Sequence, residues 1–307
     1  MSEERFNELR GEEVVYAIHR QERTFLPSRE HCPLCPTRPG GEVTEVPFEA
    51  FQIAVFENRF PAFEAPRGAA EVIVYTDEHE GSLGTLSRER AEALMWVWRH
   101  RYSELGARED VRYVMIFENR GVEVGVTLHH PHGQVYAYPF LPPVPKKELQ
   151  ADARAGGCAM CALLAGELRD RRRLVYECES VACYVPFAAR WAFEVHVVLR
   201  AHRRSLLDCD AAELRSLADA LQALVRGYDA LFARPFPYVM VVHQAPTAAA
   251  GESAAAGHVH VEFYPPLRGP DKLKYLAGSE QGAGTFIADT IPEESAATLR
   301  EAIARGA

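Results

Sequence analysis

Apolar residues recur every three to four positions in the segment that follows Ser87, which is the spacing of one face of an α-helix. Polar residues fill the intervening positions, and the Ser87 hydroxyl can accept a hydrogen bond from the first helical turn. The pattern therefore predicts a helix over 88–105. Its buried face is expected to consist of Ala91, Leu94, Met95, Trp98, Tyr102 and Leu105.

A second helix is predicted after Asp210, because Glu213 follows it by three residues, as in a capping box. Its apolar stripe comprises Leu214, Leu217, Leu221, Leu224, Val225, Tyr228 and Leu231. Segments rich in β-branched and aromatic residues lie around both helices. They predict strands of a mostly antiparallel sheet that the helices cover.

The same order of motifs occurs twice along the chain. The first half contains CPLC (32–35), a strand ending at His79, a helix, the strand YVMIFEN and then HHPHGQVYAYP. The second half contains CAMC (158–161), a strand ending at His202, a helix, the strand YVMVVHQAP and then HVHVEFYPP. This predicts two copies of one α+β unit, residues 1–150 and 151–307, joined by a proline-containing segment.

Composition restricts the class of protein. The 307 residues carry a formal net charge of −9 and contain no block of like charge, which argues against broad nucleic-acid binding. No apolar run approaches the roughly 20 residues of a membrane span, and the charged N-terminus lacks the features of a secretory signal. We expect a cytoplasmic protein with no membrane partner. Its seven cysteines are then reduced rather than paired in disulfides.

Cys32 and Cys35 have the spacing of half a tetrahedral zinc site. His79 and His130 are the candidates for the other two ligands. A redox pair or two buried thiols are the alternatives, but prolines flank the first cysteine pair and a thioredoxin-like context is missing. The pattern favours a structural zinc.

The segment His130-Pro131-His132-Gly133-Gln134 places two imidazoles and an amide on one side of an extended chain. Pro131 cannot donate to a strand ladder, and Gly133 permits a close approach to the backbone, as a phosphate would require. A neutral imidazole is a competent nucleophile toward phosphorus. These residues indicate nucleotidyl transfer.

The longer segment FENRGVEVGVTLHHPHGQVYA resembles the active-site segment of galactose-1-phosphate uridylyltransferases, which belong to the histidine-triad superfamily. The resemblance extends from Arg20 through Lys274. It implies two tandem histidine-triad-like half-barrel units, and a homodimer whose subunits share active sites. It also implies exchange of UMP between UDP-glucose and galactose 1-phosphate, with UDP-galactose as the second nucleotide sugar, by ping-pong kinetics through a uridylyl-histidine.

The resemblance also assigns roles to residues. His132 is the nucleophile and Gln134 binds a phosphoryl oxygen. Asn58 is expected to bind uridine. The residues implied in binding phosphate groups and the sugar phosphate are Arg20, Arg23, Asn119, Gly125, Thr127, Lys274 and Glu280. Thr127 stands where the family most often has serine, and the hydroxyl is retained.

Gln134 fits transfer better than hydrolysis. A sugar phosphate leaves as a stable anion, and the second substrate attacks through an ionised phosphate oxygen, so neither step needs a titrating group. Hydrolases of the superfamily have a third histidine at this position, whereas an amide cannot move a proton. The rival functions are an ADP-glucose or dinucleoside-polyphosphate phosphorylase of the same superfamily and a nucleotide-binding scaffold without turnover.

A second metal site, for zinc or iron, has two candidate ligand sets. The resemblance implies Glu148, His243, His258 and His260. The internal repeat instead places Cys158, Cys161, His202 and His258 where the first half has its predicted zinc ligands. His258 cannot easily serve both sets. The first is favoured because all four of its residues match the family.

Overall fold

The computed structural model describes residues 2–41 and 43–306. The two long helices form where the sequence predicts them. Helix α1 spans Arg88–Gly106, with the Ser87 side chain accepting a hydrogen bond from the Arg90 N–H, and helix α4 spans Ala211–Leu231 behind an Asp210–Glu213 capping box. The predicted face of α1 is buried, and that of α4 is buried except for Leu231, which is partly exposed. Three further helices are α2 (Pro143–Ala155), α3 (Ala159–Asp170) and α5 (Pro292–Gly306).

The main sheet has nine strands in the order β3-β4-β6-β5-β10-β11-β9-β8-β7, and every neighbouring pair is antiparallel. The strands of the first half are β3 (Ala54–Glu57), β4 (Ala69–Val74), β5 (Tyr113–Arg120) and β6 (His132–Tyr138). Those of the second half are β7 (Leu174–Glu177), β8 (Val181–Tyr184), β9 (Val195–Leu199), β10 (Tyr238–His243) and β11 (His260–Tyr264). Two short hairpins are formed by β1 (Glu3–Asn7) with β2 (Glu12–Tyr16) and by β12 (Leu267–Gly269) with β13 (Lys272–Leu273).

The repeat is visible in the strand order. The series β3-β4-β6-β5 of the first unit corresponds to β8-β9-β11-β10 of the second unit, and β5 pairs with β10 where the two units meet. In this central pair Phe117 lies opposite Val241. The predicted α+β fold with two tandem units is therefore confirmed, and the units share one continuous sheet.

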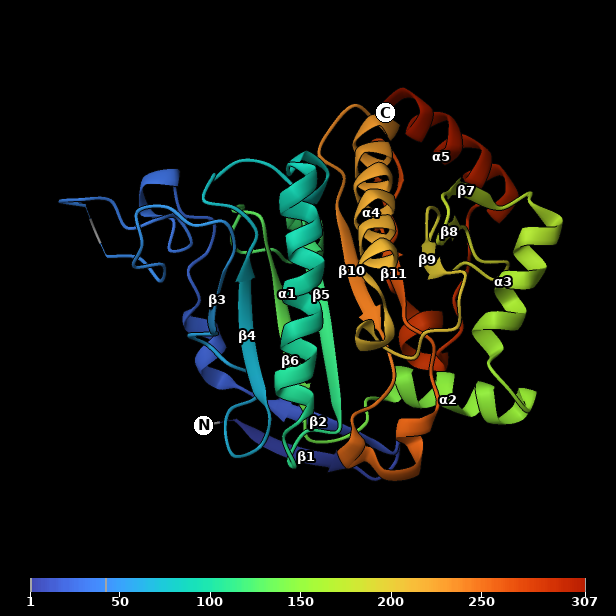
Figure 1. The fold of residues 1–307 in the computed structure, drawn as a ribbon, viewed down its shortest axis with the longest axis horizontal. Helices are drawn as coiled ribbons and strands as arrows, with labels where there is room; N and C mark the ends of the chain where they lie inside the picture. The colour runs from blue at the N-terminus through green and yellow to red at the C-terminus, as the bar shows by residue number, and fades with distance from the viewer. Residues whose placement is uncertain (1, 42, 307) are drawn as a thin grey trace.

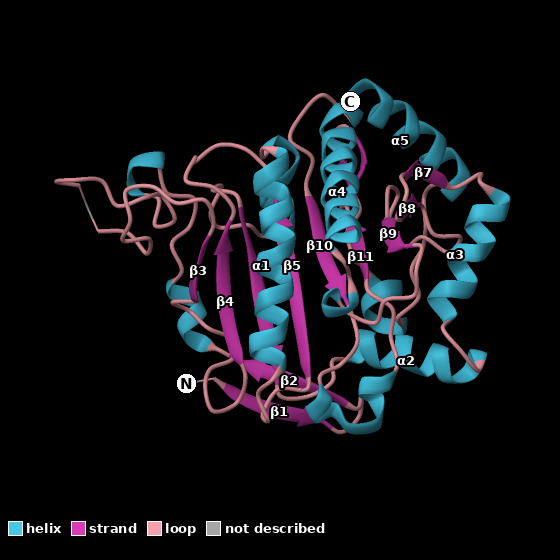
Figure 2. Ribbon diagram, viewed as in Figure 1, coloured by secondary structure: helices cyan, strands magenta, loops and turns pink. Residues whose placement is uncertain are grey.

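One face of the sheet carries the helices. Figures 1 and 2 show α1 and α4 lying side by side in front of it, with α5 beside α4. The largest buried cluster lies between the helices and the sheet and includes residues of both units, such as Trp98 and Tyr228. Burial of this apolar surface is the main stabilising contribution. The opposite face of β6 lines a cavity in the first unit.

Candidate functional site

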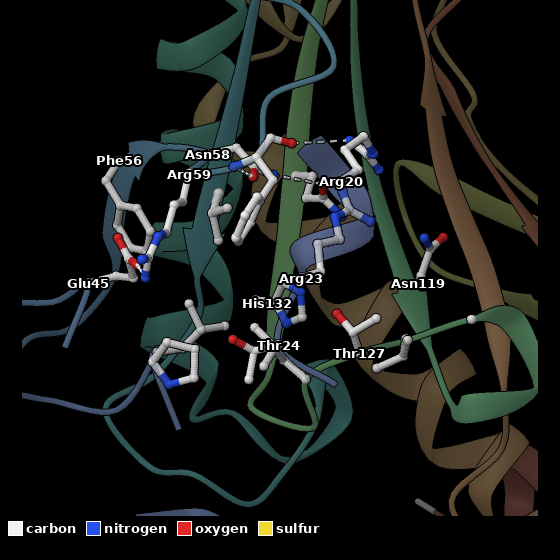
Figure 3. Close-up of a pocket in the computed structure, with 18 of the residues that line it drawn as sticks. Arg20, Arg23, Thr24, Glu45, Phe56, Asn58, Arg59, Asn119, Thr127 and His132 are labelled. Carbon is white, nitrogen blue, oxygen red and sulfur yellow. Dashed lines mark hydrogen bonds and ion pairs between the residues drawn. The ribbon is translucent and has the colours of Figure 1, made fainter. Parts of the chain in front are cut away.

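A cavity on this second face of the sheet brings together the predicted catalytic and phosphate-binding residues of the first unit (Figure 3). His132, Gln134 and Tyr136 project into it from β6, because alternate residues of a strand face the same side. The other predicted residues that line it are Arg20, Arg23, Asn58, Asn119, Gly125 and Thr127.

His132 is oriented by the backbone of its own segment. Its Nδ1 lies 2.7 Å from the carbonyl oxygen of His130, so this nitrogen carries the proton and donates it. The Nε2 then carries the lone pair, the form in which an imidazole can act as a nucleophile. Burial lowers the pKa of His132 below its ordinary value of 6.5. The imidazole is therefore neutral at pH 7, as attack on phosphorus requires.

Gln134 is held by Asn58. The Asn58 Nδ2 donates to the Gln134 Oε1 at 3.2 Å, and the Asn58 Oδ1 accepts from the Phe60 N–H at 2.9 Å. With its oxygen engaged in this way, the glutamine amide has its N–H groups available for a ligand acceptor in the cavity.

Two arginines make the cavity electropositive. Arg20 lies on the short helix Ile18–Glu22, and its Nη1 donates to the Tyr136 hydroxyl at 2.8 Å and to the Phe60 carbonyl at 3.4 Å. Arg23 follows this helix, and burial lowers its pKa, with the neighbouring Arg20 charge acting in the same direction. Guanidinium groups placed together beside an imidazole suit a diphosphate.

The loop between β5 and β6 lines the cavity with backbone. Gly121 and Gly125 have φ of 95° and 80°, values that side chains rarely tolerate. A Cβ at Gly125 would have no atom within 4 Å, so its surroundings are open to a ligand. Thr127 also lines the cavity, and its carbonyl accepts from the Leu26 N–H at 2.8 Å. This connection ties the loop to the segment that carries Arg23.

Several residues of this cavity are not among those predicted from the sequence. Tyr136 positions Arg20, and period-two alternation from His132 along β6 could have identified it. The apolar part of the wall comes from Pro33, Leu34, Phe56, Phe60, Val72 and Phe117. No local motif marks these residues, because they meet only when β3 to β6 assemble. Aromatic side chains in such a wall suit a nucleobase.

The predicted zinc ligands Cys32, Cys35, His79 and His130 lie together, with their ligand atoms within 4.8 Å of one another. The Cys35 Sγ is 3.3 Å from the His79 Nδ1 and 3.5 Å from the His130 Nδ1. The His130 Nε2 is 2.7 Å from the Thr76 carbonyl oxygen, a hydrogen bond that fixes its ring as metal-binding histidines require. Two thiols and two imidazoles suit a tetrahedral metal ion.

The second unit repeats this arrangement. Cys158, Cys161, His202 and His258 also have their ligand atoms within 4.8 Å of one another. The His258 Nδ1 is 3.5 Å from the Cys158 Sγ and 3.3 Å from the Cys161 Sγ, and its Nε2 is 3.1 Å from the Leu199 carbonyl oxygen.

A third group, whose ligand atoms also lie within 4.8 Å of one another, consists of Glu148, His243 and His260. His258 is not part of it. The His243 Nδ1 is 3.0 Å from a Glu148 carboxylate oxygen, and the His243 and His260 rings stack at 5.1 Å. The set Glu148, His243, His258 and His260 favoured from the sequence is thus divided between two groups. The reason is that β11 begins only at His260, so the two histidines are not neighbours on one strand.

The geometry can be compared with known proteins. Residues 63–142 match the family described as "Galactose-1-phosphate uridyl transferase, N-terminal domain", and residues 150–304 match its C-terminal domain. A galactose-1-phosphate uridylyltransferase of Thermotoga maritima is 38% identical, over 98% of this chain and 98% of the relative. The chain belongs to the galactose-1-phosphate uridylyltransferase family. A relative from the rat, which bears the same name, is 31% identical and covers 96% of this chain and 86% of its own.

Solved structures agree with membership of this uridylyltransferase family. A structure titled "Structure of uridylyltransferase" superimposes with a TM-score of 0.84 at 30% identity and covers 99% of both chains. An ADP-glucose phosphorylase from Arabidopsis thaliana has a TM-score of 0.75 at 21% identity over 98% of both chains, which shows a shared fold.

Two residues expected in the uridylyltransferase site lie elsewhere. Lys274 and Glu280 do not line the cavity that contains His132. Their side chains are 3.8 Å apart, and both bond to the backbone of Ile287. Within one chain the structure therefore does not bring these residues to His132. Among the helices of residues 2–41 and 43–306, none has both the length and the apolarity to traverse a bilayer.

Proposed function

We propose that this protein transfers UMP between UDP-glucose and galactose 1-phosphate through a covalent uridylyl-His132. The observation that supports this most directly is the 2.7 Å contact between the His132 Nδ1 and the His130 carbonyl oxygen. It leaves the Nε2 lone pair for a phosphorus in a cavity that also contains Arg20 and Arg23.

In the first step the His132 Nε2 attacks the α-phosphorus of UDP-glucose. A phosphorus–nitrogen bond forms, the bond to the bridging oxygen breaks, and glucose 1-phosphate leaves with both electrons of that bond. The imidazole becomes cationic while the Nδ1–H remains on the ring. The His130 carbonyl dipole stabilises that charge, because it already accepts this hydrogen bond in the free protein.

In the second step a phosphate oxygen of galactose 1-phosphate attacks the same phosphorus. The phosphorus–nitrogen bond breaks, UDP-galactose forms and neutral His132 is regenerated. Neither step transfers a proton to or from substrate. This is why an amide, Gln134, can occupy the place beside the nucleophile.

The residues that line the cavity also support an assignment of the contacts to the substrate. Asn58 and the aromatic wall face the uracil, while Arg20, Arg23, Asn119, Gly125 and Thr127 hold the diphosphate. Residues 1–150 are then the catalytic unit and 151–307 the second unit.

We infer that a second copy of the chain supplies Lys274 and Glu280 to the sugar phosphate, which makes the functional form a homodimer. Exposed apolar side chains surround these residues, with Tyr275 76% exposed and Ile287 57% exposed. Large apolar side chains left in solvent beside functional residues indicate an interface.

The metal groups have structural roles in this proposal. Cys32, Cys35, His79 and His130 would hold zinc, and His130 thereby fixes the segment that orients His132. Cys158, Cys161, His202 and His258 have the same donor set and would hold a second zinc. Glu148, His243 and His260 fit zinc or iron by ligand type.

A single-turnover experiment tests the function. The protein is mixed with UDP-glucose labelled at the α-phosphorus, without a second sugar. Label should remain on the protein and one equivalent of glucose 1-phosphate should be released. His132→Ala should abolish both, and His129→Ala, a neighbour that does not line the His132 and Gln134 cavity, should retain both. Parallel reactions with ADP-glucose identify the rival phosphorylase: labelling by ADP-glucose but not by UDP-glucose would contradict the proposal.

A further inference from the structure

A buried carboxyl group lies behind the nucleophile, on the helix-covered face of the sheet. Glu118 of β5 is only 5% exposed, and the Tyr238 hydroxyl donates to its Oε1 at 2.8 Å. Its Oε2 has no hydrogen-bond partner among the described residues. Burial raises the pKa of Glu118 to about 7. Arg120, itself paired with Asp229 at 2.7 Å, counteracts this increase.

Tyr75 connects this region to the catalytic strand. Its side chain is fully buried, and a Cβ added to Gly133 would lie 2.3 Å from its hydroxyl oxygen. The Tyr75 backbone N–H donates to the Pro131 carbonyl at 3.0 Å. Tyr75 therefore supports the chain on both sides of His132. Gly133 is required here because the tyrosine hydroxyl fills the space that a side chain would need.

The two groups share one buried space. The Tyr75 hydroxyl, like the Glu118 Oε2, lacks a hydrogen-bond partner among the described residues. Burial raises the pKa of Tyr75 well above its ordinary value, and the neighbouring charges of Glu118 and Tyr238 raise it further. Glu118 and His132 both line a cavity on this side of the nucleophile. A hydroxyl and a carboxylate thus lie directly behind the reacting histidine.

The internal repeat shows which side chains occupy the equivalent positions where no nucleophile is proposed. Val74 pairs with His132 in the first unit, as Val198 pairs with His260 in the second. The residues that follow are therefore equivalent as well. Leu199 takes the place of Tyr75, and Val261 takes the place of Gly133. Gln134 pairs with Phe117, and Glu262, which takes the place of Gln134, pairs with Val241, so Val242 takes the place of Glu118. By the same shift between β5 and β10, the residue equivalent to Tyr238 is Val114. All four equivalents are buried and aliphatic.

The equivalent positions are thus filled without any polar group. The same strands pack in the second unit with aliphatic side chains only, and that arrangement avoids the desolvation of a carboxyl group. The region behind the proposed nucleophile instead contains Glu118 and Tyr75 of the first unit and Tyr238 of the second unit. Folding does not account for these polar groups, so the reaction at His132 is the remaining reason for them.

We propose that Tyr75 and Glu118 are positioning residues for His132. Tyr75 holds the backbone of residues 131–133, with the Glu118 carboxyl in the same buried region behind it. The Nδ1–H thereby stays on the His130 carbonyl, and the Nε2 stays aimed at phosphorus while the phosphorus–nitrogen bond forms. Neither residue lines the Asn58 and Gln134 cavity. Nucleotide affinity should therefore not depend on them. The inference rests on the proposed uridylyl transfer.

The test replaces these residues by their second-unit equivalents in Tyr75→Leu/Glu118→Val. The introduced side chains match those of the second unit, and the hydrogen bond lost is the one from the Tyr238 hydroxyl. The melting temperature should therefore fall by only about a few degrees. The single-turnover release of glucose 1-phosphate should slow by about tenfold to hundredfold, as expected when a nucleophile is misplaced by less than 1 Å. The KM for UDP-glucose should change less than about twofold, because uniform binding is untouched. Tyr228→Phe, which removes another fully buried hydroxyl, is the matched control and should react at the wild-type rate.

The isosteric variants Tyr75→Phe and Glu118→Gln keep the test decisive if the double variant does not fold, and each should slow release by about tenfold. A folded double variant that reacts at the wild-type rate overturns the inference, as does an equal loss in Tyr228→Phe. Release of glucose 1-phosphate by the wild type in the same assay shows separately that the proposed function holds.

Discussion

The Asn58 Nδ2 donates to the Gln134 Oε1 at 3.2 Å, so an amide on β6 is oriented by a residue just beyond β3. The interaction directs the glutamine N–H groups toward a ligand and its oxygen away from it. In the proposed function Asn58 consequently acts on the phosphate, through Gln134, as well as on the base.

Gln134→Glu should therefore lower the rate of uridylylation by about hundredfold, because a carboxylate of the same shape repels the phosphate and loses two donors. This is comparable to the loss of one oxyanion donor in other enzymes. Rapid-quench measurement of glucose 1-phosphate release checks the rate. Asn58→Ala should produce a smaller decrease and a raised KM. A Gln134→Glu enzyme with unchanged single-turnover kinetics would show that the amide does not contact the phosphoryl group.

Glu118 should make stability depend on pH in a specific direction. Burial raises its pKa to about 7 in the folded protein, against an ordinary value of 4.5. Between these values the native state holds a proton that the unfolded chain has released. Stability must then decrease as pH rises through that window. The melting temperature of the wild type, relative to Glu118→Gln, should fall between pH 5 and pH 8.

Calorimetry of both proteins at several pH values measures this difference. Glu118→Gln is a suitable comparison because it keeps the shape of the side chain and removes the titration. A difference that stays constant, or that grows in favour of the wild type as pH rises, would show that Glu118 ionises normally in the folded protein.

Local patterns predicted the helices because their caps and stripes are encoded within one segment. Ser87 and Asp210 begin α1 and α4 as expected. His258 shows the limit of such reasoning. Alternation placed it beside His260, yet its imidazole turns to Cys161, because the chain enters β11 only at His260. Where a strand begins depends on its neighbours in the sheet, which one segment does not specify.

Gly133 shows the same limit in the active site. The sequence suggested that it permits a phosphate to approach, whereas the atom closest to its missing side chain is the Tyr75 hydroxyl. Tyr75 is distant in sequence and lies in no motif. The sequence did not mark Glu118 either, because only the pairing of β5 with β6 and of β10 with β11 shows that its counterpart is Val242. The surroundings of Gly133 and Glu118 therefore depend on contacts across the sheet, which no single segment of the sequence specifies.

Metal content should distinguish the three ligand groups. We expect Cys32→Ser and Cys158→Ser each to lose one zinc per chain, because each removes a ligand from a group of four. His243→Ala should lose a third ion, zinc or iron, and leave both of the others in place. Elemental analysis of the purified variants provides the count. If Cys158→Ser retains the metal content of the wild type, its cysteine pair is a set of buried thiols.

Loss of a metal ion should lower the stability of the protein. Loss of the Cys32 site should also slow uridylylation, because His130 both belongs to that group and carries the carbonyl that orients His132. Loss of the Cys158 site should lower the melting temperature with little effect on single-turnover chemistry. An equal effect of both variants on the rate would contradict the separate roles of the two sites.

Mixed dimers should reveal whether the active site is shared. Lys274→Ala and His132→Ala should each be severely impaired alone. In a mixed dimer the chain with intact His132 lacks its own Lys274 but can receive one from its partner. Co-expression at equal levels should therefore restore about a quarter of the wild-type activity, because half of the dimers are mixed and each contains one complete site. Differently tagged chains allow the mixed species to be isolated and assayed. If Lys274 instead serves the His132 of its own chain, no mixed dimer contains a complete site, and the activity will not exceed the sum of the two parent variants. Since the Lys274 and Glu280 side chains lie together outside the His132 cavity of the same chain, we expect restoration.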